Sequence, residues 1–201
     1  MAIPMKAGVR ALGVAESYRD GATRSTLAAA VVRADRVVDG LAYDSCTVGG
    51  TDATDAVVSL LADLDRPDAR YVLLGAVAPA WYNVLELSRI REAADRPVIA
   101  VTFEASDGLE TGIRDAFSGE ERRRRLERYR SLSPRRELSV NDETVYVRAS
   151  GLEAERVDEV VRAFTPEGGR PEPIRVASLA ARAADGYRQR SGEESSGGES
   201  E

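Results

Sequence analysis

The chain has 201 residues and a formal charge of −6 at pH 7, with 28 basic against 34 acidic side chains. It contains one cysteine, Cys46, and no histidine, which excludes an intrachain disulfide, a Cys/His zinc site and any catalytic triad with a histidine base. No apolar run approaches the roughly 20 residues that span a bilayer, and residues 1–6 lack the long apolar stretch of a secretory signal. We therefore expect a cytoplasmic protein with no membrane partner.

The first third of the chain has the pattern of β-strands. Three apolar runs, at residues 9–14, 26–32 and 37–48, follow one another with short polar connections between them. Strands in such quick succession favour an antiparallel meander.

The hydrophobic period then changes. Apolar residues recur with helical spacing up to Leu64, and Thr51 or Thr54 is the expected N-cap of this helix. A strand, a helix and a second strand are predicted next, at residues 71–77, 80–94 and 97–103. This is a βαβ crossover, so its strands should be parallel. Antiparallel strands followed by parallel ones are the order found in RNase H-like folds, and we predict an α/β protein with such a mixed sheet.

The remaining residues predict further helices and a hairpin. Helices are expected at residues 109–117, 152–164 and 173–187, a very basic stretch lies at residues 120–130, and a hairpin turns at Asn141-Asp142-Glu143. We expect one domain over residues 1–190, with a core at 8–117 and a helical and hairpin appendage at 118–190. Residues 191–201 contain only Gly, Ser and Glu, which predicts a disordered acidic tail.

Three carboxylates are candidate metal ligands. Glu16 stands where the first strand ends, and Asp52 and Asp55 stand at the start of the first helix. An i, i+3 spacing puts the two aspartates on one helix face. Mg²⁺ binds carboxylate oxygens, so the three side chains are a plausible partial ligand set. The alternative is that all three are ordinary surface carboxylates, because the helix dipole alone favours aspartate in a first turn.

A second candidate group follows the strand at residues 71–77. Asn83 and Glu86 lie beyond the carboxyl end of this strand, where active sites of open α/β sheets gather. Trp81 and Tyr82 could stack on a displaced base. Alternatively both aromatic side chains anchor the helix to the sheet, which is the favoured interpretation for Tyr82.

A strongly basic segment occupies residues 120–136. It is either a strip that binds phosphates or a solvated helix in which Glu120 and Glu121 pair with arginines at i+4. The candidate phosphate-binding residues are Arg122, Arg123, Arg124, Arg125 and Arg128.

These motifs resemble an archaeal family related to endonuclease V. The resemblance spans residues 8–190 and keeps the order of the motifs. It rests on Ala15-Glu16-Ser17, Gly50-Thr51-Asp52-Ala53-Thr54-Asp55, Trp81-Tyr82-Asn83-Val84-Leu85-Glu86, Pro97-Val98-Ile99-Ala100-Val101 and Pro171-Glu172-Pro173-Ile174-Arg175.

The resemblance implies an RNase H-like fold and a DNA-repair endonuclease that cuts DNA containing deoxyuridine or, as endonuclease V does, inosine. We expect damaged DNA or RNA as the partner and Mg²⁺ or Mn²⁺ as the cofactor. Glu16, Asp52 and Asp55 would hold the metal ion, which activates water and offsets charge at the phosphate. Asn83 and Glu86 would complete the ligand shell or position the water.

The chain departs from the pattern of the family and of endonuclease V at five positions. Ala15 replaces an acidic residue, and Gly75 stands where endonuclease V has an aspartate. Trp81-Tyr82 replaces Gly-Phe, and Glu86 replaces Asp. The two lost carboxylates motivate the alternative of a non-catalytic nucleic-acid-binding or scaffold protein on the same fold.

Overall fold

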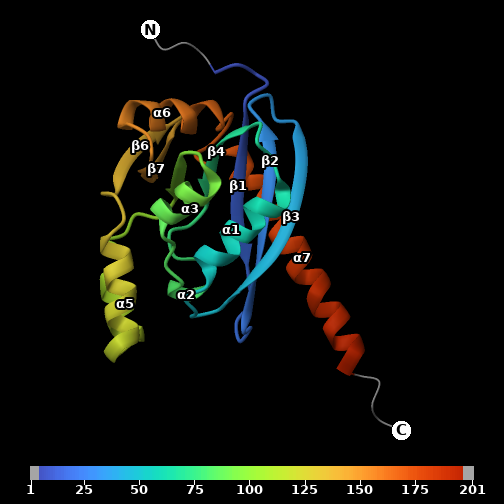
Figure 1. Ribbon diagram of the computed structural model, residues 1–201, viewed down its shortest axis with the longest axis vertical. Helices are drawn as coiled ribbons and strands as arrows, with labels where there is room; N and C mark the ends of the chain where they lie inside the picture. The colour runs from blue at the N-terminus through green and yellow to red at the C-terminus, as the bar shows by residue number, and fades with distance from the viewer. Residues whose placement is uncertain (1–4, 197–201) are drawn as a thin grey trace.

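The computed structural model describes the backbone of residues 5–196 and the side chains of residues 5–190. Seven strands form one mixed sheet in the order β3-β2-β1-β4-β5-β7-β6 (Figure 1). The strands are β1 (Arg10–Ser17), β2 (Arg24–Arg33), β3 (Val38–Thr47), β4 (Ala69–Leu74), β5 (Val98–Thr102), β6 (Arg136–Val140) and β7 (Glu143–Ser150). The helices are α1 (Ala53–Leu64), α2 (Pro79–Tyr82), α3 (Leu87–Ala94), α4 (Glu110–Ala116), α5 (Gly119–Arg130), α6 (Ala154–Ala163) and α7 (Glu172–Ser196).

The pairing of the strands confirms the predicted mixed sheet. β1 pairs with β2, and β2 with β3, in antiparallel ladders. β4 then lies parallel to β1, and β5 lies parallel to β4. The carboxyl ends of β1, β4 and β5 therefore meet at one edge of the sheet, and that edge carries the candidate site.

Helices cover both faces of the sheet. α1 and α3 pack on the face toward the viewer in Figure 1, and α7 crosses the opposite face over β1 and β2. β2 is consequently buried on both sides from Ser25 to Val32, which explains its nearly continuous apolar run. Within residues 5–196, no helix combines the length and the hydropathy that crossing a bilayer requires.

The predicted helix at residues 80–94 is wrong in its first half. α2 is a single turn in which Ala80, Trp81 and Tyr82 have φ of +49°, +56° and +61°, so its backbone is left-handed. The chain then runs extended before α3 begins at Leu87. Tertiary hydrogen bonds hold this turn: the Ala80 backbone N–H donates to Glu16, and the Gly49 N–H donates to the Ala80 oxygen. Neither bond can be read from local propensity.

Two further expectations need correction. α1 begins at Ala53 after Asp52, so neither Thr51 nor Thr54 caps it. α7 continues to Ser196, so residues 191–196 are helical where a disordered tail was expected. Helix propagation costs far less than nucleation, and Ser and Glu extend a helix that is already formed. Residues 197–201 lie outside the described residues. The predicted hairpin is present, and β7 pairs with β5, so the hairpin extends the central sheet.

Candidate active site

Glu16 is the most buried carboxylate at the sheet edge. Its Oε2 accepts hydrogen bonds from the Ser25 hydroxyl at 2.6 Å and from the Ala80 N–H at 2.7 Å. Residues 5–190 provide no donor to its Oε1. Burial raises the pKa of Glu16 above its ordinary 4.5, and the two hydrogen bonds offset this only in part. The site therefore holds a carboxylate that is oriented by two donors but not neutralised by a cation.

Asp52 is oriented by a different set of donors. Its Oδ1 accepts from the Thr47 N–H at 3.0 Å and from the Asn83 amide nitrogen at 2.8 Å. Its Oδ2 accepts from the Thr47 hydroxyl at 2.8 Å, and Arg24 lies 3.6 Å away. Burial acts to raise the pKa of Asp52, but the hydrogen bonds from Thr47 and Asn83 outweigh it and hold the pKa below its usual value. Asp52 is therefore ionised at neutral pH.

Asn83 connects the elements on which the site depends. It is fully buried, and its amide nitrogen donates both to Asp52 and to the Thr47 backbone oxygen, at 3.0 Å. Its side-chain oxygen accepts from the Ala53 N–H at 3.0 Å, which is at the start of α1. Both amide hydrogens are used, so Asn83 positions Asp52 and has no donor left for a substrate.

One turn of the backbone contacts both Glu16 and Asp52. The turn that holds Glu16 through Ala80 holds Asp52 through Asn83. Cys46 is buried and is affected by both carboxylates: burial first, then the charges of Glu16 and Asp52, raise the pKa of its thiol to about 12. The thiol is consequently protonated and unreactive at neutral pH.

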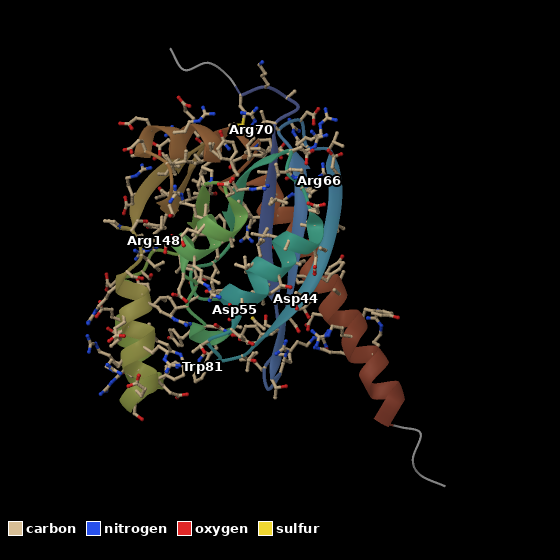
Figure 2. All side chains as sticks on the ribbon, in the orientation of Figure 1. Asp44, Asp55, Arg66, Arg70, Trp81 and Arg148 are labelled. Atoms are coloured by element: carbon tan, nitrogen blue, oxygen red, sulfur yellow. The ribbon has the colours of Figure 1, made fainter. Side chains whose placement is uncertain are left out.

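Asp55 and Glu86 are not brought to Glu16. Asp55 is on the solvent side of α1 and forms an ion pair with Arg89 (Figure 2). The Glu86 carboxylate lies 3.3 Å from Arg128. Among the described side chains, no three carboxylates or thiols are grouped so that they could share a metal ion. The i, i+3 rule fails here because Asp52 precedes the helix and turns toward Thr47.

The aromatic residues of the left-handed turn have separate roles. Tyr82 packs its hydroxyl end against Gly112 of α4, which agrees with the anchoring interpretation. Trp81 is 48% exposed and lies against Gly49, where an added Cβ would come within 2.8 Å of the indole ring. Its ring centroid is 5.1 Å from that of Phe117. About half of the Trp81 side chain therefore remains exposed to solvent.

Two arginines of α5 bind backbone oxygens of the protein. Arg125 is buried, stacks 3.7 Å above the Phe117 ring and donates to the backbone oxygens of Gly49 and Gly50. Arg128 donates to the Thr51 oxygen at 3.0 Å. Both residues hold the loop that precedes Asp52, a role that sequence reasoning missed. The helical spacing of Leu126, Tyr129 and Leu132 was the available signal, because it places Arg125 beside the buried face.

The other three arginines of that set are on the solvent side of α5. Arg123 pairs with Glu120 and Glu127. Arg122 and Arg124 are exposed, and the side chain of neither forms an ion pair or a hydrogen bond within residues 5–190.

A cavity of about 170 Å³ opens beside Glu16, and Ala15, Gly75 and Arg170 are among its lining residues. Ala15 and Gly75 are two of the positions at which the chain departs from the family pattern. A Cβ on Gly75 would lie 2.9 Å from the Ile174 side chain of α7. The packing of α7 therefore excludes an aspartate at position 75 unless the helix moves.

A comparison of the sequence with protein families identifies the family of this chain. Residues 7–185 match the family described as Endonuclease dU. The chain belongs to the Endonuclease dU family. A UPF0215 protein of Pyrobaculum calidifontis is 31% identical to this Endonuclease dU member over 181 residues, which cover 89% of this chain and 98% of that protein.

Solved structures show the fold that this Endonuclease dU chain shares. A protein of unknown function from Archaeoglobus fulgidus has a TM-score of 0.73 at 23% identity, with 88% of this chain and 98% of that chain covered. Human ENDOV has a TM-score of 0.63 at 12% identity, with 90% and 86% covered. Endonuclease V of Ciona intestinalis, solved with an inosine-containing DNA, has a TM-score of 0.56 at 13% identity, with 88% and 85% covered. The fold is the RNase H-like fold of endonuclease V, as predicted.

Ionisation of Glu16 should destabilise the metal-free protein. Because the pKa of Glu16 is raised in the fold, its stability contribution is complete below the ordinary pKa of 4.5 and is lost as the pH rises through the raised value. Glu16→Gln is neutral at every pH, and its side-chain oxygen can still accept hydrogen bonds from Ser25 and Ala80. We expect the melting temperature of the variant, measured in EDTA, to exceed that of the wild type increasingly from acidic to alkaline pH. Parallel melting curves at all pH values would contradict this prediction.

Proposed function

We propose that this protein is a metal-dependent endonuclease that hydrolyses a phosphodiester bond in DNA containing deoxyuridine or inosine. The Endonuclease dU family membership gives the reaction class. The observation that carries the proposal is the pairing of Glu16 and Asp52 through one turn, at the edge of the sheet where β1 and β4 end.

Two carboxylates could supply ligands to one divalent ion. Mg²⁺ prefers oxygen ligands, is commonly held by one or two carboxylates plus substrate phosphates, and keeps several waters. Glu16 offers an oxygen without a donor, and a nearby cation would offset the cost of burying its charge. Glu16 and Asp52 would therefore hold the ion. When bound, it would polarise a phosphoryl oxygen and lower the pKa of water.

The surrounding residues orient these two carboxylates. Ser25 and the Ala80 N–H fix Glu16, and Thr47 and Asn83 fix Asp52. Such support keeps reacting groups within the small tolerance that catalysis requires. Asp55 and Glu86 have no part in this proposal, because arginines pair with both. The exposed part of the Trp81 side chain would offer a stacking surface for a base.

One observation favours a second function. Ala15 and Gly75 line the cavity beside Glu16, and the contact of Gly75 with Ile174 leaves no room for another carboxylate. A protein that binds damaged nucleic acid without cutting it would have the same fold and the same cavity.

Incision assays test the proposal against this alternative. The purified protein is incubated with single- and double-stranded DNA that carries one deoxyuridine or one inosine, and with inosine-containing RNA. Mg²⁺, Mn²⁺ and EDTA are compared, and undamaged strands of the same sequence are the control. We expect incision of a damaged DNA in the presence of either metal only. Metal-independent binding of the damaged strands without any incision would favour the second function.

A further inference from the structure

Three arginines surround a cavity next to the one that contains Glu16. This cavity has a volume of about 380 Å³ and lies beyond the carboxyl ends of β4 and β5. Its lining includes Arg135 and Arg148 from the β6–β7 hairpin and its approach, and Arg170 from the loop before α7. Gly75 and Arg170 line both cavities, so the two are adjacent.

None of these three guanidinium groups has a carboxylate partner among the described side chains, whereas other arginines of the chain, such as Arg66 and Arg130, do. Arg135 donates to the backbone oxygen of Ser106 at 2.5 Å. Arg148 donates to the Tyr129 hydroxyl at 3.1 Å and to the Ser133 oxygen. The one carboxylate residue of the lining, Glu104, contacts Arg135 through its backbone oxygen. The cavity therefore has an excess of positive charge.

Aromatic rings fix the orientation of the three guanidinium groups. Arg135 lies 3.7 Å above the Tyr146 ring, Arg148 lies 5.1 Å above the Tyr129 ring, and Arg170 lies 4.3 Å above the Phe103 ring. Stacking occupies the face of a guanidinium and leaves its in-plane N–H donors, of which Arg135 and Arg148 each give two to protein oxygens and keep the rest. Planar donors held in this way match the oxygens of a phosphate, to which arginine binds with two parallel hydrogen bonds.

We propose that this cavity, defined by Arg135, Arg148 and Arg170, binds a backbone phosphate of the nucleic-acid strand beside the one at Glu16. The inference rests on the proposed function for the position of the scissile phosphate. It places the path of the strand across the carboxyl edge of β4 and β5 instead of along α5, where Arg125 is buried and Arg128 lies 3.3 Å from the Glu86 carboxylate. Phosphate contacts of this kind fix the register of a strand without reading its sequence.

The salt dependence of binding tests the proposal. Anisotropy of a fluorescein-labelled, undamaged single strand is measured in EDTA over a range of salt concentrations, so that incision plays no part. Each lost phosphate contact should lower the slope of log K against log salt by roughly 0.7 for a single strand. We expect that loss for Arg170→Gln or Arg135→Gln, and about twice that loss for the double variant. Arg170→Lys should keep the slope and weaken binding, because its charge remains and its planar donors do not.

Two variants with the same change of charge are the controls. Arg70 is exposed near the start of β4, at the opposite end of that strand, and forms no ion pair within residues 5–190 (Figure 2). Arg70→Gln and the Arg122→Gln, Arg124→Gln pair should leave the slope unchanged. The proposal would be overturned if the slope of log K against log salt fell in the Arg122→Gln, Arg124→Gln variant and stayed at the wild-type value in Arg170→Gln.

Inorganic phosphate alone distinguishes a strand from a free anion. If phosphate raises the melting temperature of the wild type but not of Arg170→Gln, while strand binding is equal in both, the cavity takes a free anion and the proposal fails. Failure of the proposed function is separable from this result. If the wild type binds strands through Arg170 but incises none of them, only the proposed nuclease activity is contradicted. If the wild type incises damaged DNA but Arg170→Gln has the same slope of log K against log salt, only the phosphate site is contradicted.

Discussion

Glu16→Gln should lower the rate of incision by about 10³-fold. Glutamine keeps the size of the side chain and can accept the hydrogen bonds from Ser25 and Ala80, but it removes the negative charge that holds a divalent ion. A divalent ion contributes several kcal/mol of transition-state stabilisation, and about 1.4 kcal/mol corresponds to a factor of ten. Single-turnover incision rates with saturating Mg²⁺ measure the effect.

Asp55→Asn is the matched control for this prediction. It makes the same chemical change at a neighbouring carboxylate that is exposed and paired with Arg89. Incision by this variant should stay within about twofold of the wild type, since surface ion pairs contribute little. An equal loss of incision in both variants would mean that Asp55 is a metal ligand after all, as the sequence motif suggested.

Asn83→Ala should produce the largest loss of stability among substitutions at the site. Asn83 is fully buried and satisfies the Thr47 oxygen, the Ala53 N–H and the Asp52 carboxylate. Leaving a buried polar group without its partner costs roughly 1–3 kcal/mol, so we expect the free energy of unfolding to fall by about 3–5 kcal/mol. At roughly 2–4 °C per kcal/mol, the melting temperature should fall by about 6–20 °C. Urea and thermal unfolding measure both quantities.

Gln189→Ala provides the comparison for Asn83→Ala. Gln189 is also an amide side chain, but it is only partly buried and makes a single hydrogen bond of 3.4 Å to Asp185. Its removal should change the free energy of unfolding by less than about 0.5 kcal/mol. Similar losses for the two variants would show that the hydrogen bonds of Asn83 are not what stabilises the turn.

The strands were predictable from sequence because their burial is repetitive. β2 is apolar on both faces and β1 ends at a polar residue, so the position of Glu16 followed directly from the strand boundary. The left-handed turn was not predictable. Its three residues include no glycine, and the bonds that hold it come from Glu16 and Gly49, which are distant in the chain.

The prediction of candidate metal ligands depended on a helix boundary that sequence patterns do not fix to a single residue. Because α1 starts one residue after Asp52, the Asp52 carboxylate turns toward Thr47 and that of Asp55 turns toward Arg89. A spacing rule for residues inside a helix therefore grouped two side chains that the fold separates. The basic cavity was equally hidden, because Arg135, Arg148 and Arg170 come from separate segments.

The left-handed turn also makes the positions of Glu16 and Asp52 sensitive to temperature. Three consecutive non-glycine residues with positive φ each cost roughly 1–2 kcal/mol, and the tertiary hydrogen bonds of the turn must offset this cost, so heat that weakens those bonds favours release of the segment. Its release would free Glu16 from Ala80 and Asp52 from Asn83 in the same event. The molecule would then lose both carboxylates from their working positions while the sheet remained intact, and its useful temperature range would end below the temperature at which the whole domain unfolds.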